Sequence, residues 1–193
     1  MLDFIQIPER AAKPRCCGLT HVLDKGLGLR QIHDMLETSG DYIDILKLGW
    51  GTGFVTRNLS DKIAVYQKAG IPVCFGGTLL EVALAQGRFE AYCDAVRRLQ
   101  LTHVEFSTGV LEMELERKAD YVYRLAQEFT VLAEVGSKDA SAAVTPSLWI
   151  QEIGLLLQAG AWKVIAEARE SGTVGLYTKT GETRLDLIDE IRK

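Results

Sequence analysis

Residues 42–53, YIDILKLGWGTG, combine a short apolar run with a lysine and a turn that contains three glycines. The apolar run predicts a β-strand that is covered on both faces, as strands of parallel sheets are. Lys47 lies at the C-terminal end of this strand, where (β/α) barrels and open α/β sheets place their ligand sites. The stretch therefore predicts the start of a strand–helix unit with a functional end.

Five other segments repeat this arrangement, each with an apolar strand, a charged or glycine-rich end and an amphipathic helix. One strand and one crossover per roughly 25–35 residues is typical of βαβ connections. The expected parallel strands lie near 19–25, 43–49, 72–76, 103–107, 131–135 and 163–167. The expected helices cover 29–38, 60–69, 79–86, 89–99, 112–128, 148–159 and 183–192.

Two of these helices carry local start signals. Ser60 is predicted as the N-cap of the helix over 60–69, because a serine hydroxyl can accept a hydrogen bond from a free backbone N–H there. Thr145 and Pro146 are predicted as the N-cap and the first-turn proline of the helix over 148–159.

Two sheet geometries agree with this pattern, a doubly wound open sheet and a closed barrel. An open sheet usually carries a phosphate-binding glycine fingerprint after its first strand, and DKGLG at residues 24–28 does not match it. Charged residues at nearly every strand end favour a barrel, whose strand ends converge on one mouth. We therefore predict an α/β fold of the (β/α)8 TIM-barrel type, with about six βα units present.

The domain prediction is a single (β/α)-barrel domain over residues 1–193 that lacks the last two βα units. The first and sixth strands would then be edges that need to be covered or paired. We accordingly expect a homo-oligomer.

Composition excludes several classes of protein. The formal net charge of −4 gives no basic surface for nucleic acid, and no apolar run is long enough to cross a membrane. The charged N-terminal stretch lacks the apolar core of a signal peptide and is expected to be a short arm packed on the domain. The four cysteines have no metal-ligand spacing, so we predict reduced thiols and a cytoplasmic location.

Three carboxylates mark the predicted mouth. Glu105, Glu134 and Glu167 each follow two to four apolar residues, so each is expected to be partly buried and to need a cation. The cation could be a lysine or arginine across the mouth, or a metal ion. Oxygen-only ligands would favour Mg²⁺ over zinc.

A set of cations occupies the same strand ends and suits phosphate, carboxylate or sulfonate groups. It consists of Lys25, Lys47, Lys138 and Arg169. The glycine-containing turns at 49–53, 76–78 and 171–173 leave backbone N–H groups for further anion contacts.

Five motifs carry a resemblance to a known family. They are GLTHVLDKGLGLRQ (18–31), DYIDILKLGWGTG (41–53), GGTLLEVALAQGRFEAY (76–92), EVGSKD (134–139) and VIAEARESGTVGLY (164–177). In these motifs the chain resembles phosphosulfolactate synthase, and the match runs in order from about residue 15 to about residue 191. The motifs are long and unusual in composition, which makes a chance similarity improbable.

The resemblance implies a (β/α)8 barrel and a lyase that adds sulfite to phosphoenolpyruvate with the help of Mg²⁺. The implied product is (2R)-2-O-phospho-3-sulfolactate, an intermediate on the route to coenzyme M in methanogens and to sulfolactate in some bacteria. Plant heat-stress-associated proteins share the core motifs without an established synthase role. The resemblance also implies two further strands beyond residue 193.

The family motifs place Asp24, Lys25, Lys47, Lys138, Glu167, Arg169 and Glu170 in the implied site. From charge and placement, we assign Glu134 and Glu167 to Mg²⁺, with Asp24 or Glu105 as a third ligand. Substrate anions are assigned to Lys25, Lys47 and Arg169, with Glu170, Ser171 and Gly172 beside them. Lys138 is assigned to proton delivery, and Lys25 and Lys47 are the other catalytic candidates.

Three functions stay open at this point. The first is the synthase reaction itself. The second is an enzyme that acts on another phosphorylated carboxylate with the same anion- and metal-binding residues. The third is a non-catalytic stress or interaction protein on the same fold. The charged mouth favours the first two, and the predicted loss of two βα units favours the third.

Overall fold

Six strands alternate with helices along the chain in the computed structural model, which describes residues 4–6, 8–109, 111–136, 145–168 and 171–192. The strands fall within or beside the ranges predicted from the sequence. They are β1 (His21–Asp24), β2 (Ile45–Leu48), β3 (Val73–Phe75), β4 (His103–Phe106), β5 (Thr130–Val135) and β6 (Lys163–Ala166).

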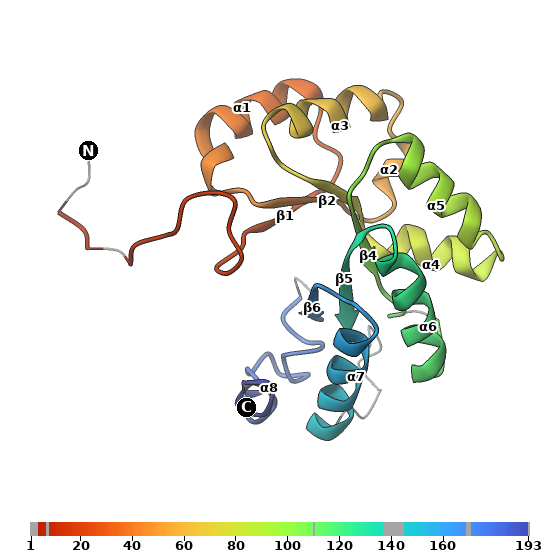
Figure 1. Ribbon diagram of the computed structural model, residues 1–193. Helices are drawn as coiled ribbons and strands as arrows, with labels where there is room; N and C mark the ends of the chain where they lie inside the picture. The colour runs from red at the N-terminus through yellow and green to blue at the C-terminus, as the bar shows by residue number, and fades with distance from the viewer. Residues whose placement is uncertain (1–3, 7, 110, 137–144, 169–170, 193) are drawn as a thin grey trace.

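Helices α1 to α7 lie between successive strands in the chain and cover their outer side, whereas α8 follows β6 and packs against α7 (Figure 1). The helices are α1 (Leu29–Ser39), α2 (Thr52–Val55), α3 (Leu59–Lys68), α4 (Gly77–Ala85), α5 (Phe89–Arg98), α6 (Leu115–Ala126), α7 (Pro146–Gln158) and α8 (Leu185–Ile191). A short 3₁₀ helix, η1 (Gly40–Tyr42), precedes β2. None of the helices in the described ranges is long and apolar enough to cross a bilayer.

The strands form two parallel three-stranded sheets, β1-β2-β3 and β4-β5-β6, each in sequence order. This confirms the predicted parallel α/β architecture. The inner faces carry a small apolar layer in which Ile45, Cys74 and Leu132 pack with Leu19 and Ile165. Closure of the strands into an eight-stranded barrel stays a prediction.

The two sheets meet at the ends of β3 and β4. Gly77, the first residue of α4, lies against Ser107, and a Cβ atom at position 77 would overlap the Ser107 side chain. The Gly77 N–H also donates a hydrogen bond of 2.8 Å to Oε1 of Glu105 in β4. Glycine is therefore required here because the backbone of one unit contacts the side chains of the next.

A larger apolar core lies between the strands and the outer helices. Its helix residues include Ile32, Tyr66, Leu80, Val122 and Trp149, which are almost completely buried. Burial of each large apolar side chain contributes about 1.5–3 kcal/mol, so this layer holds the helices against the strands. The strands keep their inner faces for the small apolar layer and for the charged residues described below.

Local signals predicted some helix boundaries well and others poorly. Thr145 is the N-cap of α7 and Pro146 is its first residue, as predicted. The Ser60 prediction was wrong, because α3 begins at Leu59 and Asn58 occupies the N-cap. Leu59 packs against the core, and this packing outweighs the capping preference of serine. Helix α2 was not predicted because four residues show no helical period.

The N-terminal arm is mostly exposed and extends away from the domain (Figure 1), and one carboxylate holds the part of it that precedes β1. Asp44, directly before β2, contacts Arg15 at 2.7 Å and Arg10 at 3.0 Å. It also accepts a 2.8 Å hydrogen bond from the Thr20 backbone N–H, just before β1. Burial favours the neutral acid, but the Thr20 hydrogen bond and the Arg15 guanidinium outweigh it and lower the pKa of Asp44.

We predict that Asp44→Asn lowers the free energy of unfolding at pH 7 by about 1.5–3 kcal/mol, the range for hydrogen bonds to charged groups. Because the folded-state pKa is lowered, the stabilisation is present above the ordinary pKa of 3.8 and is lost as pH falls below it. Urea unfolding of both proteins at pH 7 and at acidic pH would measure this. Asp41→Asn, on an exposed neighbour, is the matched control, and equal loss in the two variants would contradict the prediction.

Candidate active site

A cavity of about 610 Å³ lies at the C-terminal ends of the strands. All six strand ends contribute to its lining, directly or through the residue that follows the strand. Its charged lining residues are Lys47 from β2, Glu105 from β4, Glu134 from β5 and Glu167 after β6. The structure therefore brings together four of the residues predicted for the mouth.

Lys47 and Glu105 form an ion pair at the base of this charged cluster. Lys47 Nζ lies 2.7 Å from Glu105 Oε2, and the two side chains are 19% and 3% exposed. The other oxygen of Glu105 accepts the Gly77 N–H at the N-terminus of α4, where the helix dipole favours a negative charge. The cation that Glu105 needs is thus a lysine from β2, a strand of the other sheet.

The environment shifts the pKa of both partners upward. Burial raises the pKa of Glu105 even though Lys47 opposes this shift. Burial alone would lower the pKa of Lys47, but attraction to Glu105 outweighs it and raises the pKa. Both the attraction between the charges and their hydrogen bond contribute to the raised pKa of Lys47. Lys47 is therefore held as a partly buried ammonium ion at the cavity.

Glu134 and Glu167 lie at the ends of two adjacent strands. The Ser107 hydroxyl donates to Glu134 Oε1 at 3.1 Å, which links the ends of β4 and β5. Gly136, with φ of 107°, brings the chain after β5 close to Glu167, since a Cβ there would lie 3.0 Å from the Glu167 Cβ. The close packing after β5 and β6 holds both carboxylates at the same cavity.

The oxygen donors at this cavity form a partial set for a metal ion. Within the described ranges no group of three or more histidine, cysteine, aspartate or glutamate side chains could hold a metal. Glu105 is engaged by Lys47 and Gly77, and Glu134 and Glu167 are the other carboxylates that line the cavity. Mg²⁺ is commonly bound by one or two carboxylates plus water and substrate phosphate. The residues present fit that mode of binding.

Asp24 lies in a different environment from the other predicted ligands. Its Oδ1 accepts hydrogen bonds from the backbone N–H groups of Gly26 and Leu27 at 2.7 and 2.8 Å and from Lys62 Nζ at 2.9 Å. Its Oδ2 accepts the Tyr66 hydroxyl at 2.8 Å. Both oxygens are therefore supplied with protein donors, and its assignment to a metal ion stays a prediction without a contact at the cavity.

Sequence reasoning missed Lys62 and Tyr66. Both belong to helix α3, whereas the site residues predicted from the sequence lie at the ends of strands. The signal available in the sequence was their spacing. Lys62 and Tyr66 are four residues apart, so they lie on the same face of a helix.

Lys25 and Ser171 lie beside the charged cluster. The Lys25 ammonium lies 4.6 Å from the ring centre of Trp50, a cation–π distance. Trp50 lines the cavity and has a left-handed φ of 52° in the turn after β2. Ser171 also lines the cavity, and its hydroxyl lies 2.9 Å from that of Thr173.

The remaining assignments have less structural information. Gly172 is described with a φ of 64° but does not line the cavity. Lys138, Arg169 and Glu170 lie outside the described residues, so their assigned roles stay predictions.

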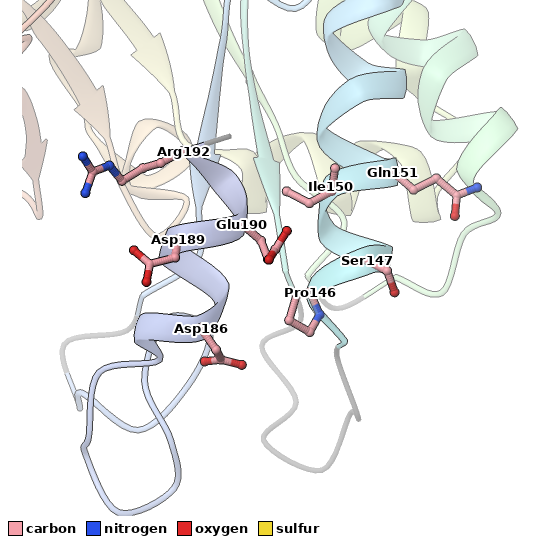
Figure 2. Close-up of a pocket in the computed structure, with 8 residues that line it drawn as sticks. All are labelled: Pro146, Ser147, Ile150, Gln151, Asp186, Asp189, Glu190 and Arg192. Carbon is pink, nitrogen blue, oxygen red and sulfur yellow. The ribbon is translucent and has the colours of Figure 1, made fainter.

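A second cavity, of about 1160 Å³, lies between α7 and α8. Its ionisable lining residues are Asp186, Asp189, Glu190 and Arg192 (Figure 2). Figure 2 shows Glu190 directed toward α7 and Arg192 directed away from it. This cavity lies between two helices and away from the strand ends, where parallel α/β folds place their ligand sites, so the smaller cavity is the better candidate.

Comparison with known proteins places this chain in a family. A family model described as (2R)-phospho-3-sulfolactate synthase (ComA) matches residues 8–193. The chain belongs to the phosphosulfolactate synthase family. Thus the resemblance seen in the sequence motifs is confirmed.

Three curated phosphosulfolactate synthases are similar over most of the chain. The Bacillus subtilis protein is 40% identical over 99% of this chain and 77% of its own length. The Methanothermobacter thermautotrophicus protein is 38% identical over 95% of this chain and 73% of its own length. The Methanocaldococcus jannaschii protein is 40% identical over 91% of this chain and 72% of its own length.

We predict that Glu105→Gln lowers the pKa of Lys47, because burial would remain while the main attracting charge is removed. The glutamine oxygen can still accept the Gly77 N–H, which keeps the start of α4 in place. Titration of ¹³C-methylated lysines by NMR would measure the pKa of Lys47, with Lys47→Arg used to assign its signal. Glu134→Gln is the matched control, since Glu134 contributes less to the Lys47 shift. An equal or larger effect of Glu134→Gln would contradict this account.

Proposed function

We propose that this member of the phosphosulfolactate synthase family catalyses the Mg²⁺-dependent addition of sulfite to phosphoenolpyruvate. The product would be (2R)-2-O-phospho-3-sulfolactate, and the enzyme would be a lyase that forms a carbon–sulfur bond. The observation that carries the proposal is the Lys47 ammonium, held by Glu105 in a cavity at the strand ends. Family membership supports the choice of substrates.

The reaction joins the sulfur lone pair of sulfite to C3 of phosphoenolpyruvate. As the C–S bond forms, the π electrons of the C2–C3 double bond move toward C2 and the carboxylate. One proton then adds to C2, so sulfite, phosphoenolpyruvate and a proton give one product and no leaving group. The demand on the protein is therefore to stabilise additional negative charge and to deliver a proton to one face.

Lys47 suits the first demand. Its ammonium is partly buried, and a fixed charge in such a place stabilises a developing anion more strongly than in water. Because Glu105 and the start of α4 hold it, little reorganisation is needed when the substrate charge increases. Lys25 and Arg169 would bind the phosphate and sulfonate groups, with Glu170, Ser171 and Gly172 beside them.

Glu134 and Glu167 would hold Mg²⁺ together with water and substrate oxygens. When bound, the ion would supply positive charge to the substrate carboxylate.

Lys138 would deliver the proton to C2, and Lys47 is the other candidate donor. A donor on one face of the cavity would set the R configuration of the product. Lys138 follows β5 by three residues in the motif EVGSKD, close in sequence to Glu134.

The proposal is tested by assaying phosphosulfolactate formation from phosphoenolpyruvate and sulfite. We expect turnover in Mg²⁺, loss in EDTA and recovery when Mg²⁺ is restored. Glu134→Gln and Glu167→Gln should raise the Mg²⁺ concentration needed for half-maximal turnover, because each removes a ligand charge. Glu37→Gln, on the exposed face of α1, is the matched control.

Three outcomes would contradict the proposal or a part of it. Full turnover in metal-free buffer would remove the Mg²⁺ assignment. Tight phosphoenolpyruvate binding without sulfite addition would favour an enzyme for another phosphorylated carboxylate, and absence of both binding and turnover would favour a non-catalytic protein.

For Lys138 we predict that substitution by methionine, which keeps similar bulk, lowers turnover by roughly 10²–10⁴-fold, as loss of a general acid does. The KM for phosphoenolpyruvate should change little, because the substrate anions are assigned to other cations. Steady-state kinetics of Lys138→Met would be compared with those of Lys179→Met, a variant at an exposed lysine. Unchanged turnover in Lys138→Met would transfer the proton-donor role to Lys47.

A further inference from the structure

We propose that Lys62 and Tyr66 of α3 are positioning residues for the active site, which act through Asp24 on the turn that carries Lys25. The assignment of Lys25 to substrate anions rests on the proposed function, whereas the effect on the turn does not. In this proposal Asp24 organises the turn from within the core and does not bind a metal ion.

The first observation is a buried polar cluster outside the cavity. Asp24, Lys62 and Tyr66 are 0%, 2% and 0% exposed. Lys62 Nζ lies 2.9 Å from Oδ1 and 2.8 Å from Oδ2 of Asp24, and the Tyr66 hydroxyl donates to Oδ2 at 2.8 Å. The hydrogen bonds from Lys62, Gly26, Leu27 and Tyr66 outweigh burial and lower the pKa of Asp24. Asp24 is therefore an ionised carboxylate whose two oxygens both accept hydrogen bonds.

The second observation is that the cluster ties both ends of one turn to α3. Asp24 is the last residue of β1, and its Oδ1 accepts the N–H groups of Gly26 and Leu27. Lys62 Nζ also donates to the Leu27 carbonyl oxygen at 2.9 Å. One lysine thus contacts the start and the end of the turn. Lys25 lies inside this turn, so its backbone is fixed on both sides.

The third observation connects the turn to the cavity. The Lys25 ammonium lies over the ring of Trp50, and Trp50 lines the cavity. A displacement of the turn would move the ammonium away from this ring. The path from α3 to the mouth is therefore Lys62 and Tyr66, then Asp24, then the turn and Lys25.

Energetics argue that this cluster does more than stabilise the fold. Burial of an ion pair has a large desolvation cost, and apolar side chains of similar volume often give equal or greater stability. An apolar substitute could fill the space between β1 and α3 but could not bind two N–H groups and a carbonyl of the turn. Hydrogen bonds from Asp24 and Lys62 therefore fix the conformation of the turn, which apolar side chains could not do.

The experiment compares Tyr66→Phe and Lys62→Met with a control, Tyr92→Phe. Tyr92 is also buried, and its hydroxyl has no hydrogen-bond partner in the described structure, so its loss should be almost neutral. Amide hydrogen exchange of residues 24–28 is the first readout. We expect faster exchange at Gly26 and Leu27 in both variants and no change in the control. Unchanged exchange in Tyr66→Phe, the variant that alters least, would overturn the proposal.

The second readout separates positioning from a purely structural role. Tyr66→Phe should raise the KM for phosphoenolpyruvate roughly 2- to 100-fold, the span of coupling between contacting residues, with a smaller change in kcat. In a Lys25→Met background the same substitution should raise KM no further, because its effect passes through Lys25. Equal KM increases in both backgrounds, or a lowered Tm with unchanged KM, would overturn the proposal.

The two readouts also distinguish this proposal from the proposed function. If the chain shows no sulfite addition, the same cycle is measured as the Kd of phosphoenolpyruvate by titration calorimetry. Faster exchange with a Kd effect that disappears in the Lys25→Met background would support positioning even when the synthase reaction fails. Slow exchange in all variants would reject positioning even when the synthase reaction succeeds.

Discussion

The contact of Glu105 with Lys47 and Gly77 is the interaction on which the candidate site depends. It joins residues of β2, α4 and β4, and it lies where the two parallel sheets meet. Removal of Lys47 alone would leave a carboxylate buried without its cation, which is strongly unfavourable. The same contact therefore constrains the packing of the two sheets and the chemistry at their ends.

This constraint explains why the charges of the site are gathered at one end of the strands. On the inner faces, Ile45, Cys74 and Leu132 are almost completely shielded from solvent, so an unpaired charge among them would be unfavourable. Cys74 and Leu132 stand in register with Lys47 and Glu105, which pair with each other while they face the cavity. The apolar layer therefore lies at the level of the ion pair.

Two buried ion pairs serve different ends in this structure. Lys47 and Glu105 border the cavity and can respond to a bound anion. Lys62 and Asp24 lie in the core and fix the turn that carries Lys25, whose ammonium lies over the ring of Trp50. The pair of Lys47 and Glu105 provides charge at the cavity, and the pair of Lys62 and Asp24 holds the turn after β1 in place.

The sequence by itself determined the family, the parallel strand–helix order and the membership of Lys47, Glu105, Glu134 and Glu167 in one mouth. These follow from local patterns, because apolar strands with charged ends are read within a few residues. Only the tertiary structure decided that Glu105 pairs with Lys47 and that Asp24 binds Lys62 and Tyr66. Each of these contacts joins residues of different strand–helix units, and a strand-end carboxylate has several possible cations. Three-dimensional packing selects the partner, because a buried carboxylate is stable only beside a cation that reaches it.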